Sequence, residues 1–381
     1  MIHRDRMTNT VLDLVRLDSH SRQEKSVAKY LVRALTELGA SVYVDDAGPA
    51  VRSDTGNVVA RLEGTAPGAA PLLLSSHMDV VPPGLSVKPI REGDRIRSDG
   101  TTILGGDDKT GLAIILEVAR TLVEQALPRP QIEIAFTICE EIGLLGAKHL
   151  DVGRLLAREA IVLDSASSAE LVTRAPSADA FTFTVHGLEA HAGVCPETGI
   201  SAVRVASEAI TAMPLGRIDA QTTANVTIAE SSPATNVVPN LCVVRGEARS
   251  LRDDRLDEVM RTIRRSFADA AARATISLGG ETRRAWIEET CSREYHSLDI
   301  PDSAPIVQLV MRAARKLAAP VKTVTIGGAS DANVLNRHGI AAVNLGTGMR
   351  DIHTVNEWID LADFYRSAEL VLECVKERAA A

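Results

Sequence analysis

The hydrophobic pattern of the first half of the chain predicts alternating strands and helices. Helical periodicity covers residues 9–38, with a break at 18–22, and returns at 109–122 and 143–149. Runs of strand length that are almost entirely apolar lie between these segments, at 41–45, 56–62, 71–75, 131–138 and 160–163. Strands that are apolar on both faces belong to sheets covered on both sides. We therefore expect a three-layer α/β/α domain around a largely parallel sheet.

The pattern changes near residue 177. Four strand-like segments and two helical segments then follow in the order β-α-β-β-α-β, at 181–185, 201–213, 224–230, 241–249, 256–274 and 283–289. A helix at 304–317, a short strand at 341–344 and a helix at 360–378 resume the first pattern. We therefore expect a ferredoxin-like domain at 177–290, inserted into an α/β domain made of residues 1–176 and 291–381.

Composition narrows the class of protein. The 381 residues are 45% hydrophobic and 24% charged, which is ordinary for a globular chain long enough for two domains. The formal net charge is −8 and the basic residues are scattered, which argues against nucleic acid or a membrane surface as partner. No apolar run reaches the ~18 residues of a membrane span. The five cysteines show no CxxC spacing. We expect a soluble cytoplasmic protein with a small-molecule substrate.

Candidate metal ligands follow the predicted strands of the α/β domain. His77 and Asp79 come after the strand at 71–75 and share one face, because strand side chains alternate. The others lie in loops after strands or in a glycine-rich turn: Asp107, Glu140, Glu141, Asp164 and His353. Open α/β sheets place their sites at the carboxyl ends of the strands, so we expect these side chains to meet. Asp108, by contrast, is expected only to begin a helix.

A charge count favours two metal ions at this place. Two Zn²⁺ ions carry four positive charges, which three carboxylates and one hydroxide cancel, and two neutral imidazoles complete the set. The matching residues are His77, His353, Asp107, Glu141 and Asp164. Zinc is the expected metal, with cobalt or manganese as alternatives. Glu140 is left over, and a free carboxylate beside an activated water suits a general base.

Five motifs together resemble one known superfamily. They are SSHMDVV (75–81), GGDDKTG (105–111), CEEIGLLGA (139–147), LDS (163–165) and IHTVNE (352–357). In this order they resemble the co-catalytic zinc exopeptidases, the superfamily of peptidase T, carboxypeptidase G and the aminoacylases, and most of all its peptidase T-like branch. The resemblance implies that Asp79 orients His77 and that Glu140 is the general acid/base. It also implies two ligand pairs and a bridge: His77 with Glu141, Asp164 with His353, and Asp107 between them.

The inserted domain resembles the lid and dimerisation domain of the same superfamily. The resemblance implies that His191 crosses a homodimer to the partner's active site and stabilises the tetrahedral intermediate, although an ordinary loop histidine is the alternative. It places Asn236 and Arg249 among the substrate-binding groups, and the guanidinium of Arg249 would suit a substrate carboxylate. Gly328 and Ser330 lie in a stretch that we expect to let the substrate approach the backbone closely.

The expected activity is hydrolysis of a peptide bond in short peptides, with release of the amino-terminal residue. The segment TGMRDI before His353 departs from the pattern of tripeptidases. A deacylase or amidohydrolase of N-acyl or N-carbamoyl amino acids is therefore kept as an alternative. A non-catalytic metal-binding relative is a third possibility, but the complete ligand set with the spare Glu140 argues against it.

Overall fold

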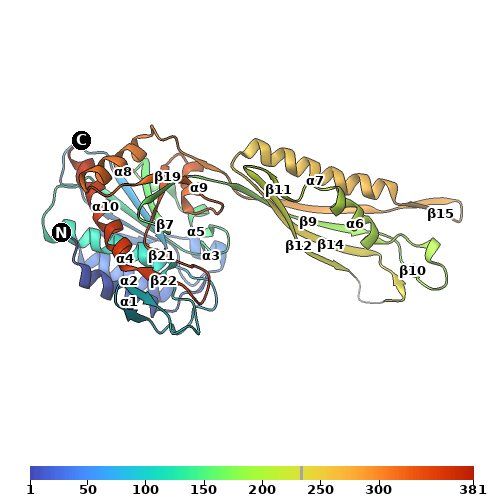
Figure 1. Ribbon diagram of the computed structural model, residues 1–381, viewed down its shortest axis with the longest axis horizontal. Helices are drawn as coiled ribbons and strands as arrows, with labels where there is room; N and C mark the ends of the chain where they lie inside the picture. Colours follow the sequence, from blue (N-terminus) through green and yellow to red (C-terminus); the bar gives the residue numbers. More distant parts are fainter. Residues whose placement is uncertain (232–234) are drawn as a thin grey trace. The chain divides into compact units, whose positions relative to one another are not determined.

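The chain folds into two compact units, which the computed structural model describes for residues 1–231 and 235–381. Unit 1 contains Met1–Ala175 and Leu298–Ala381, and unit 2 contains Pro176–Ser297 (Figure 1). The chain therefore leaves unit 1 beside the expected boundary at 176. It returns later than the expected 290, because the last strand of unit 2, β17 (Trp286–Tyr295), runs through that point.

Unit 1 is built on a nine-stranded sheet in which β1, β2, β6, β3, β7, β20, β8 and β18 follow one another and β19 pairs with β8. The strands are β1 (Ser41–Val44), β2 (Val58–Leu62), β3 (Leu72–His77), β6 (Ile132–Thr137), β7 (Glu159–Ser165), β8 (Glu170–Ala175), β18 (Leu298–Asp299), β19 (Lys322–Thr325) and β20 (Ala341–Gly346). Four central neighbours, β6, β3, β7 and β20, run parallel. The expectation of a largely parallel sheet was too broad, because β1, β2 and β18 pair antiparallel with their neighbours.

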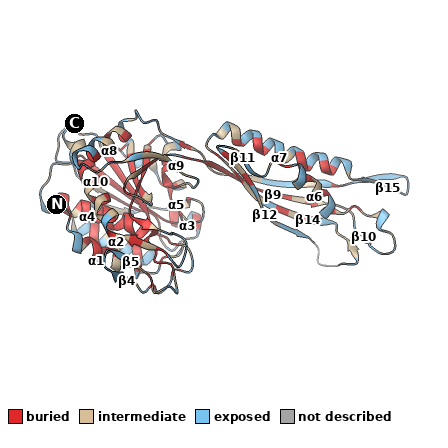
Figure 2. Cartoon of the chain, in the orientation of Figure 1, coloured by how far each residue is buried: buried red, intermediate tan, exposed pale blue. Residues whose placement is uncertain are grey.

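Helices cover both faces of this sheet, which confirms the expected three-layer α/β fold. Along β3, Leu72 and Leu74 belong to one hydrophobic core, whereas Leu73 belongs to another, because consecutive strand residues face opposite sides. The first core is shared with α1 (Arg4–Val15), α2 (Lys25–Glu37), α4 (Gly106–Glu124), α8 (Pro305–Lys316) and α10 (Leu361–Ala379). The second is shared with α9 (Asp331–Arg337). The strands between the layers are accordingly buried (Figure 2).

Short elements complete unit 1. The helices α3 (Ala47–Val51) and α5 (Leu145–Lys148) lie in loops between strands. A small sheet in the order β21-β22-β5-β4 contains Met349–Arg350, Trp358–Asp360, Arg95–Arg97 and Ile90–Glu92. His353 lies in the loop between β21 and β22. This small antiparallel sheet, which the hydrophobic pattern did not predict, therefore fixes both ends of the loop that carries His353.

Unit 2 is an antiparallel sheet in the order β11-β12-β14-β9-β17 with two helices. Its elements are β9 (Ser177–His186), α6 (Ala202–Ala212), β11 (Gly216–Asp219), β12 (Thr222–Ser231), β14 (Leu241–Ser250), α7 (Asp253–Arg273) and β17. A pair β10 (Ala190–His191) and β13 (Val237–Val238) and a hairpin β15 (Thr275–Leu278) and β16 (Glu281–Arg284) are added. When β11 and these two additional pairs are left out, the remaining elements follow the expected β-α-β-β-α-β order along the chain. Phe183 stacks on Phe267 in the core between sheet and α7.

Among the described residues, no helix has both the length and the apolar character needed to cross a bilayer.

Candidate metal centre and active site

The expected ligands meet at the carboxyl ends of the central parallel strands. His77 is the last residue of β3, and Asp164 is the next-to-last residue of β7. Both strands thus extend further than their apolar runs predicted. Glu140 and Glu141 follow β6, and Asp107 lies in the first turn of α4. Because β6, β3 and β7 are parallel neighbours, their ends bring these side chains to one place.

The ligand atoms form two groups that share Asp107. In the first group, His77 Nε2 lies 3.1 Å from Asp107 Oδ1 and 3.8 Å from Asp164 Oδ1. In the second group, His353 Nε2 lies 3.1 Å from Asp107 Oδ2 and 3.1 Å from Glu141 Oε1. Within each group the ligand atoms lie within 4.8 Å of one another. Asp107 offers one carboxylate oxygen to each group, which is the arrangement of a bridging ligand.

This grouping corrects one of the two ligand pairs that the resemblance implied. His77 and Glu141 do share a group, with Glu140 as its third member, but Asp164 and His353 share none among residues 1–231 and 235–381. Asp164 lies instead with His77 and Asp107, and His353 lies with Glu141 and Asp107. The register of the sheet explains the difference. Ser75 of β3 lies opposite Val162 of β7, so His77 and Asp164, each two residues further on, reach the same point.

The cluster contains more carboxylates than positively charged groups, which suits it to hold cations. Burial and repulsion from neighbouring carboxylates raise the pKa of Glu140 and of Asp164 well above the ordinary values. Hydrogen bonds to Asp107 and Glu141 raise the pKa of His353 to about 10. Such a surplus of buried carboxylates must either stay protonated or be balanced by added positive charge. Imidazole nitrogens and carboxylate oxygens are ligands of divalent zinc, cobalt and manganese, so the residues fit two such cations.

Asp79 holds both His77 and the loop after β6. His77 Nδ1 lies 3.0 Å from the backbone oxygen of Asp79 and 3.5 Å from its Oδ1, so the carbonyl is the nearer acceptor. The Asp79 carboxylate accepts hydrogen bonds from the backbone N–H groups of Glu140 (2.9 Å) and Glu141 (3.2 Å). It also accepts one from Ser21 Oγ at 2.7 Å. Asp79 therefore positions the two glutamates as well as the imidazole.

Glu357 is a supporting residue for which we predicted no role from the sequence. It is fully buried, and its carboxylate accepts hydrogen bonds from the backbone N–H groups of Leu104 (2.9 Å), Gly105 (2.7 Å) and Asp107 (2.9 Å). Burial raises its pKa to about 7. Its position in the motif IHTVNE, four residues after His353, was the available signal. Glu357 fixes the backbone that carries the shared ligand Asp107.

Asp108 does more than begin a helix. It is fully buried, and its carboxylate accepts hydrogen bonds from Ser76 Oγ at 2.6 Å and from the N–H of Gly111 at 3.0 Å. The second bond is the expected interaction with a helix start. The first ties the beginning of α4 to β3, and so holds Asp107 beside His77. The peptide bond between Asp107 and Asp108 is cis.

Two proposed substrate contacts in unit 1 have contrasting surroundings. Ser330 is buried and caps α9, because its side chain and that of Asn333 bind each other's backbone N–H groups. Gly328 is exposed, and an added Cβ there would meet nothing within 4 Å. Next to Ser330, the Asp331 carboxylate accepts a hydrogen bond from Thr137 at the end of β6. Contact of Ser330 or Gly328 with substrate stays a prediction.

The candidate residues of unit 2 lie at two ends of its sheet. His191 is exposed in β10, and Asn236 lies beside it, because the Asn236 carbonyl accepts a hydrogen bond from Ala192 N at 2.9 Å. Arg249 lies near the other end of β14, where its guanidinium donates to both oxygens of Glu247 at 3.0 and 3.1 Å. Leu241, at the beginning of β14, is roughly 25 Å from Arg249 at about 3.3 Å per strand residue. Their roles stay predictions.

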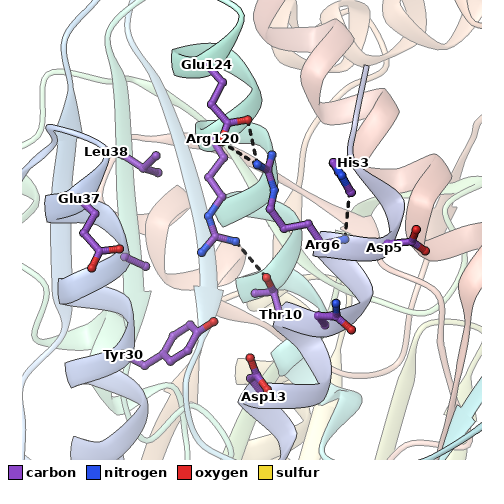
Figure 3. Close-up of a pocket in the computed structure, with 12 residues that line it drawn as sticks. His3, Asp5, Arg6, Thr10, Asp13, Tyr30, Glu37, Leu38, Arg120 and Glu124 are labelled. Atoms are coloured by element: carbon purple, nitrogen blue, oxygen red, sulfur yellow. Dashed lines mark hydrogen bonds and ion pairs between the residues drawn. The ribbon is translucent and has the colours of Figure 1, made fainter.

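A separate cavity of about 570 Å³ lies between α1, α2 and α4 (Figure 3). Its lining includes Arg6, Thr10, Arg120 and Glu124 and contains none of the candidate metal ligands. Arg6 forms ion pairs with Glu117 and Glu124, and Arg120 donates a hydrogen bond to Thr10 Oγ1 at 2.9 Å. Arg6 and Arg120 are thus bound to neighbouring side chains, and the candidate metal ligands lie elsewhere in unit 1.

The three-layer fold and the shared ligand set define a metal-dependent hydrolase. The chain belongs to the peptidase family M20/M25/M40, whose family model matches residues 73–377. It is 38% identical over the full length of both chains to uncharacterized protein YqjE of Bacillus subtilis. It is 25% identical to peptidase T of Vibrio cholerae, with 94% of this chain and 92% of the relative covered.

Two solved structures are similar over nearly the whole chain. The crystal structure of aminopeptidase PepT from Bacillus cereus is 37% identical, with 99% of each chain covered and a TM-score of 0.92. That of a tripeptidase from Staphylococcus aureus is 35% identical, with 100% of each chain covered and a TM-score of 0.94. These similarities confirm the predicted resemblance to the peptidase T-like branch.

Proposed function

We propose that this protein is a metal-dependent exopeptidase that hydrolyses short peptides and releases the amino-terminal residue. The observation that carries the proposal is Asp107, which offers one oxygen to each of two ligand groups, with Glu140 beside them. The similar PepT aminopeptidase and tripeptidase support the choice of short peptides with a free amino end.

The chain's own residues have separable tasks in this reaction. Divalent cations held by the two groups would polarise the peptide carbonyl and lower the pKa of the attacking water. Glu140 is the group that moves protons: it accepts one from the water and donates one to the leaving amine nitrogen. The raised pKa of Glu140, caused first by burial, suits it to hold that proton between the two transfers. Asp79 and Glu357 keep the surrounding backbone in place.

We propose zinc as the metal, with two ions per chain. The support is the donor set of two imidazole nitrogens and three carboxylates, which matches the charge count for two zinc ions and one hydroxide. Cobalt and manganese accept the same ligands and are the alternatives. Metal analysis of the purified protein, with reloading after chelation, tests the stoichiometry and the order of preference.

We also propose a homodimer formed through unit 2, in which His191 serves the partner's active site. A tripeptide spans at most about 11 Å, whereas roughly 25 Å separates Arg249 from the end of β14 near which His191 lies. One chain therefore cannot place both residues on one short substrate, but two chains can. Mixing Glu140→Ala with His191→Ala protein under subunit exchange should restore part of the activity. No recovery despite verified exchange would reject the shared site.

The activity itself is tested with a matched substrate panel. Metal-loaded protein should release the amino-terminal residue from tripeptides with a free amino group, and Glu140→Gln should remove this activity. Hydrolysis of N-acetyl or N-carbamoyl amino acids in place of tripeptides would establish the deacylase alternative. Turnover of neither class by fully metal-loaded protein would favour the non-catalytic relative. A cytoplasmic location stays a prediction, for which cell fractionation is the test.

A further inference from the structure

Two buried carboxylates bind three successive backbone N–H groups at the start of the Glu140 loop. Cys139 N donates to Glu24 Oε1 at 2.9 Å. Glu140 N donates to Asp79 Oδ1 at 2.9 Å, and Glu141 N donates to Asp79 Oδ2 at 3.2 Å. Asp79 was expected at the site, but Glu24 was not, because a single glutamate before a helix gives no signal in the sequence. The proposed reaction gives Glu24 no chemical step.

Glu24 joins three parts of unit 1 that are distant in sequence. Its Oε1 accepts hydrogen bonds from the N–H of Arg22 at 2.9 Å and from Cys139 Sγ at 3.3 Å, besides that from Cys139 N. Its Oε2 accepts one from Ser53 Oγ at 2.7 Å. The side chain is fully buried. Glu24 therefore accepts hydrogen bonds from both the backbone and the side chain of Cys139, the residue that precedes Glu140.

These hydrogen bonds matter because two residues of the loop have an unfavourable backbone conformation. Cys139 has φ 52° and Leu144 has φ 58°, which is the left-handed region. In this conformation the Cβ of an L-residue lies too close to the following carbonyl oxygen, so it is unfavourable for a residue with a side chain. Without the bonds to Glu24, Cys139 would be free to relax toward an ordinary conformation, and Glu140 would turn with it.

We infer that Glu24 is a positioning residue that sets the place of the Glu140 carboxylate through the backbone of Cys139. The inference rests on the proposed function, since it concerns the acid/base role of Glu140. Without Glu24, Asp79 should still bind the N–H groups of Glu140 and Glu141 and so hold the ligand Glu141, whereas the N–H of Cys139 loses its acceptor and the turn before Glu140 can relax. The metal ligands should therefore stay in place while the acid/base group shifts, and a displacement on the order of 1 Å at a reacting group can lower the rate about 100-fold.

The first test compares variants of Glu24 with a matched control. Glu24→Ala should lower kcat roughly 10- to 100-fold, with little change in KM and with both metals still bound. Glu24→Gln should restore most of kcat, because an amide oxygen can also accept from Cys139 N. The control is Glu133→Ala at the opposite end of β6. Glu133 is equally buried and accepts hydrogen bonds from Leu156 N (2.9 Å) and Ala157 N (2.8 Å), so its loss also leaves backbone groups unpaired.

The second test does not depend on activity. Hydrogen exchange of a peptide covering residues 138–144 should be faster in Glu24→Ala than in native protein and unchanged in Glu133→Ala. If Glu24→Ala does not fold, Ser53→Ala removes only the bond to Oε2 and should lower kcat by a smaller factor, about 3- to 10-fold. Equal kcat in the Glu24 and Glu133 variants, or unchanged exchange at 138–144, would overturn the inference. If native protein hydrolyses no peptide, the proposed function fails, while the exchange result still reports on the positioning.

Discussion

Glu140 and Glu141 are neighbours in the chain but have different contacts. Glu141 Oε1 lies 3.1 Å from His353 Nε2 and completes the second ligand group. Glu140 is more deeply buried and belongs to neither of the two groups that share Asp107, although it forms a third group with His77 and Glu141. Asp79 binds the backbone N–H groups of both residues, so a single buried carboxylate supports the backbone from which both side chains extend.

This difference predicts opposite outcomes for two isosteric substitutions. Glu140→Gln should retain both metals and lower kcat by roughly 10²- to 10⁴-fold, because the amide cannot carry the proton. Glu141→Gln should weaken metal binding, because it removes a charged ligand of the second group. Metal content after dialysis and kcat on a tripeptide are the measurements. Metal loss from the Glu140 variant alone would show that the two roles are reversed.

The identities of these residues could be read from the sequence, but their grouping could not. His77, Asp107, Glu141, Asp164 and His353 stand in motifs at strand ends, and the fold brings all five together. Which ligand faces which depends on the register between β3 and β7, and this is fixed by packing across the sheet. Glu24 and Glu357 act through backbone N–H groups, and sequence does not reveal such contacts; only the place of Glu357 in the motif IHTVNE offered a signal.

At the scale of elements, α4 packs against β7 through a glycine. A Cβ added to Gly111 would lie 2.3 Å from the backbone oxygen of Leu163, the residue before Asp164. The absence of a side chain thus allows the start of the helix to approach the strand closely. This approach brings Asp107 and Asp164 to the same end of the sheet.

Gly111→Ala should therefore destabilise the protein by roughly 1–3 kcal/mol, because the helix must move away from the strand. Metal affinity should fall as well, since the movement separates Asp107 from Asp164. Chemical denaturation and a chelator competition assay measure the two effects. Gly327→Ala is the control: an added Cβ there meets nothing within 4 Å, and its stability should change by less than about 0.5 kcal/mol.

The elements that the sequence predicted are the ones with long periodic patterns. The central strands and the helices α4, α7, α8 and α10 lie close to their expected ranges. The small sheet β21-β22-β5-β4 was missed because its strands have only two or three residues, too few to show alternation. The antiparallel edges of the large sheet were missed because strand direction depends on the connections, which hydrophobicity does not record.

At the scale of the whole molecule, the two units have separate hydrophobic cores. The core of unit 2 lies between its own sheet and the helices α6 and α7, and the candidate metal ligands all belong to unit 1. A ligand stabilises only the part of a protein that must be folded to bind it, by about 4 kcal/mol at a thousandfold excess over its dissociation constant.

Removal of metal should therefore affect the two units unequally. After treatment with a chelator, hydrogen exchange should accelerate in peptides from β3, β6 and β7 and remain unchanged in peptides from β9 and β14. Mass spectrometry of the digested protein separates the two sets. Equal acceleration in both would mean that the units unfold as one cooperative body. Readdition of zinc should reverse the change, which controls for irreversible damage.

The points where the chain leaves and re-enters unit 1 are neighbours in one sheet. Ala175, at the end of β8, lies opposite Leu298, at the beginning of β18, in an antiparallel pair. An antiparallel pair of this kind can be closed by a two-residue turn. Joining 175 to 298 through Asn-Gly should thus give a protein that folds and binds two metals but hydrolyses no peptide. Circular dichroism and metal analysis check this, and an unfolded product would contradict it.

In genetic terms, residues 176–297 are a cassette spliced into a hairpin. In the sheet of unit 1, the insertion takes the place of a turn between β8 and β18. Its length and sequence can therefore change while the pairing of these two strands is kept. A gene that exchanges this cassette for another would acquire new surfaces for substrate selection and subunit association in a single recombination event. The metal ligands, all encoded outside the cassette, would be inherited unaltered.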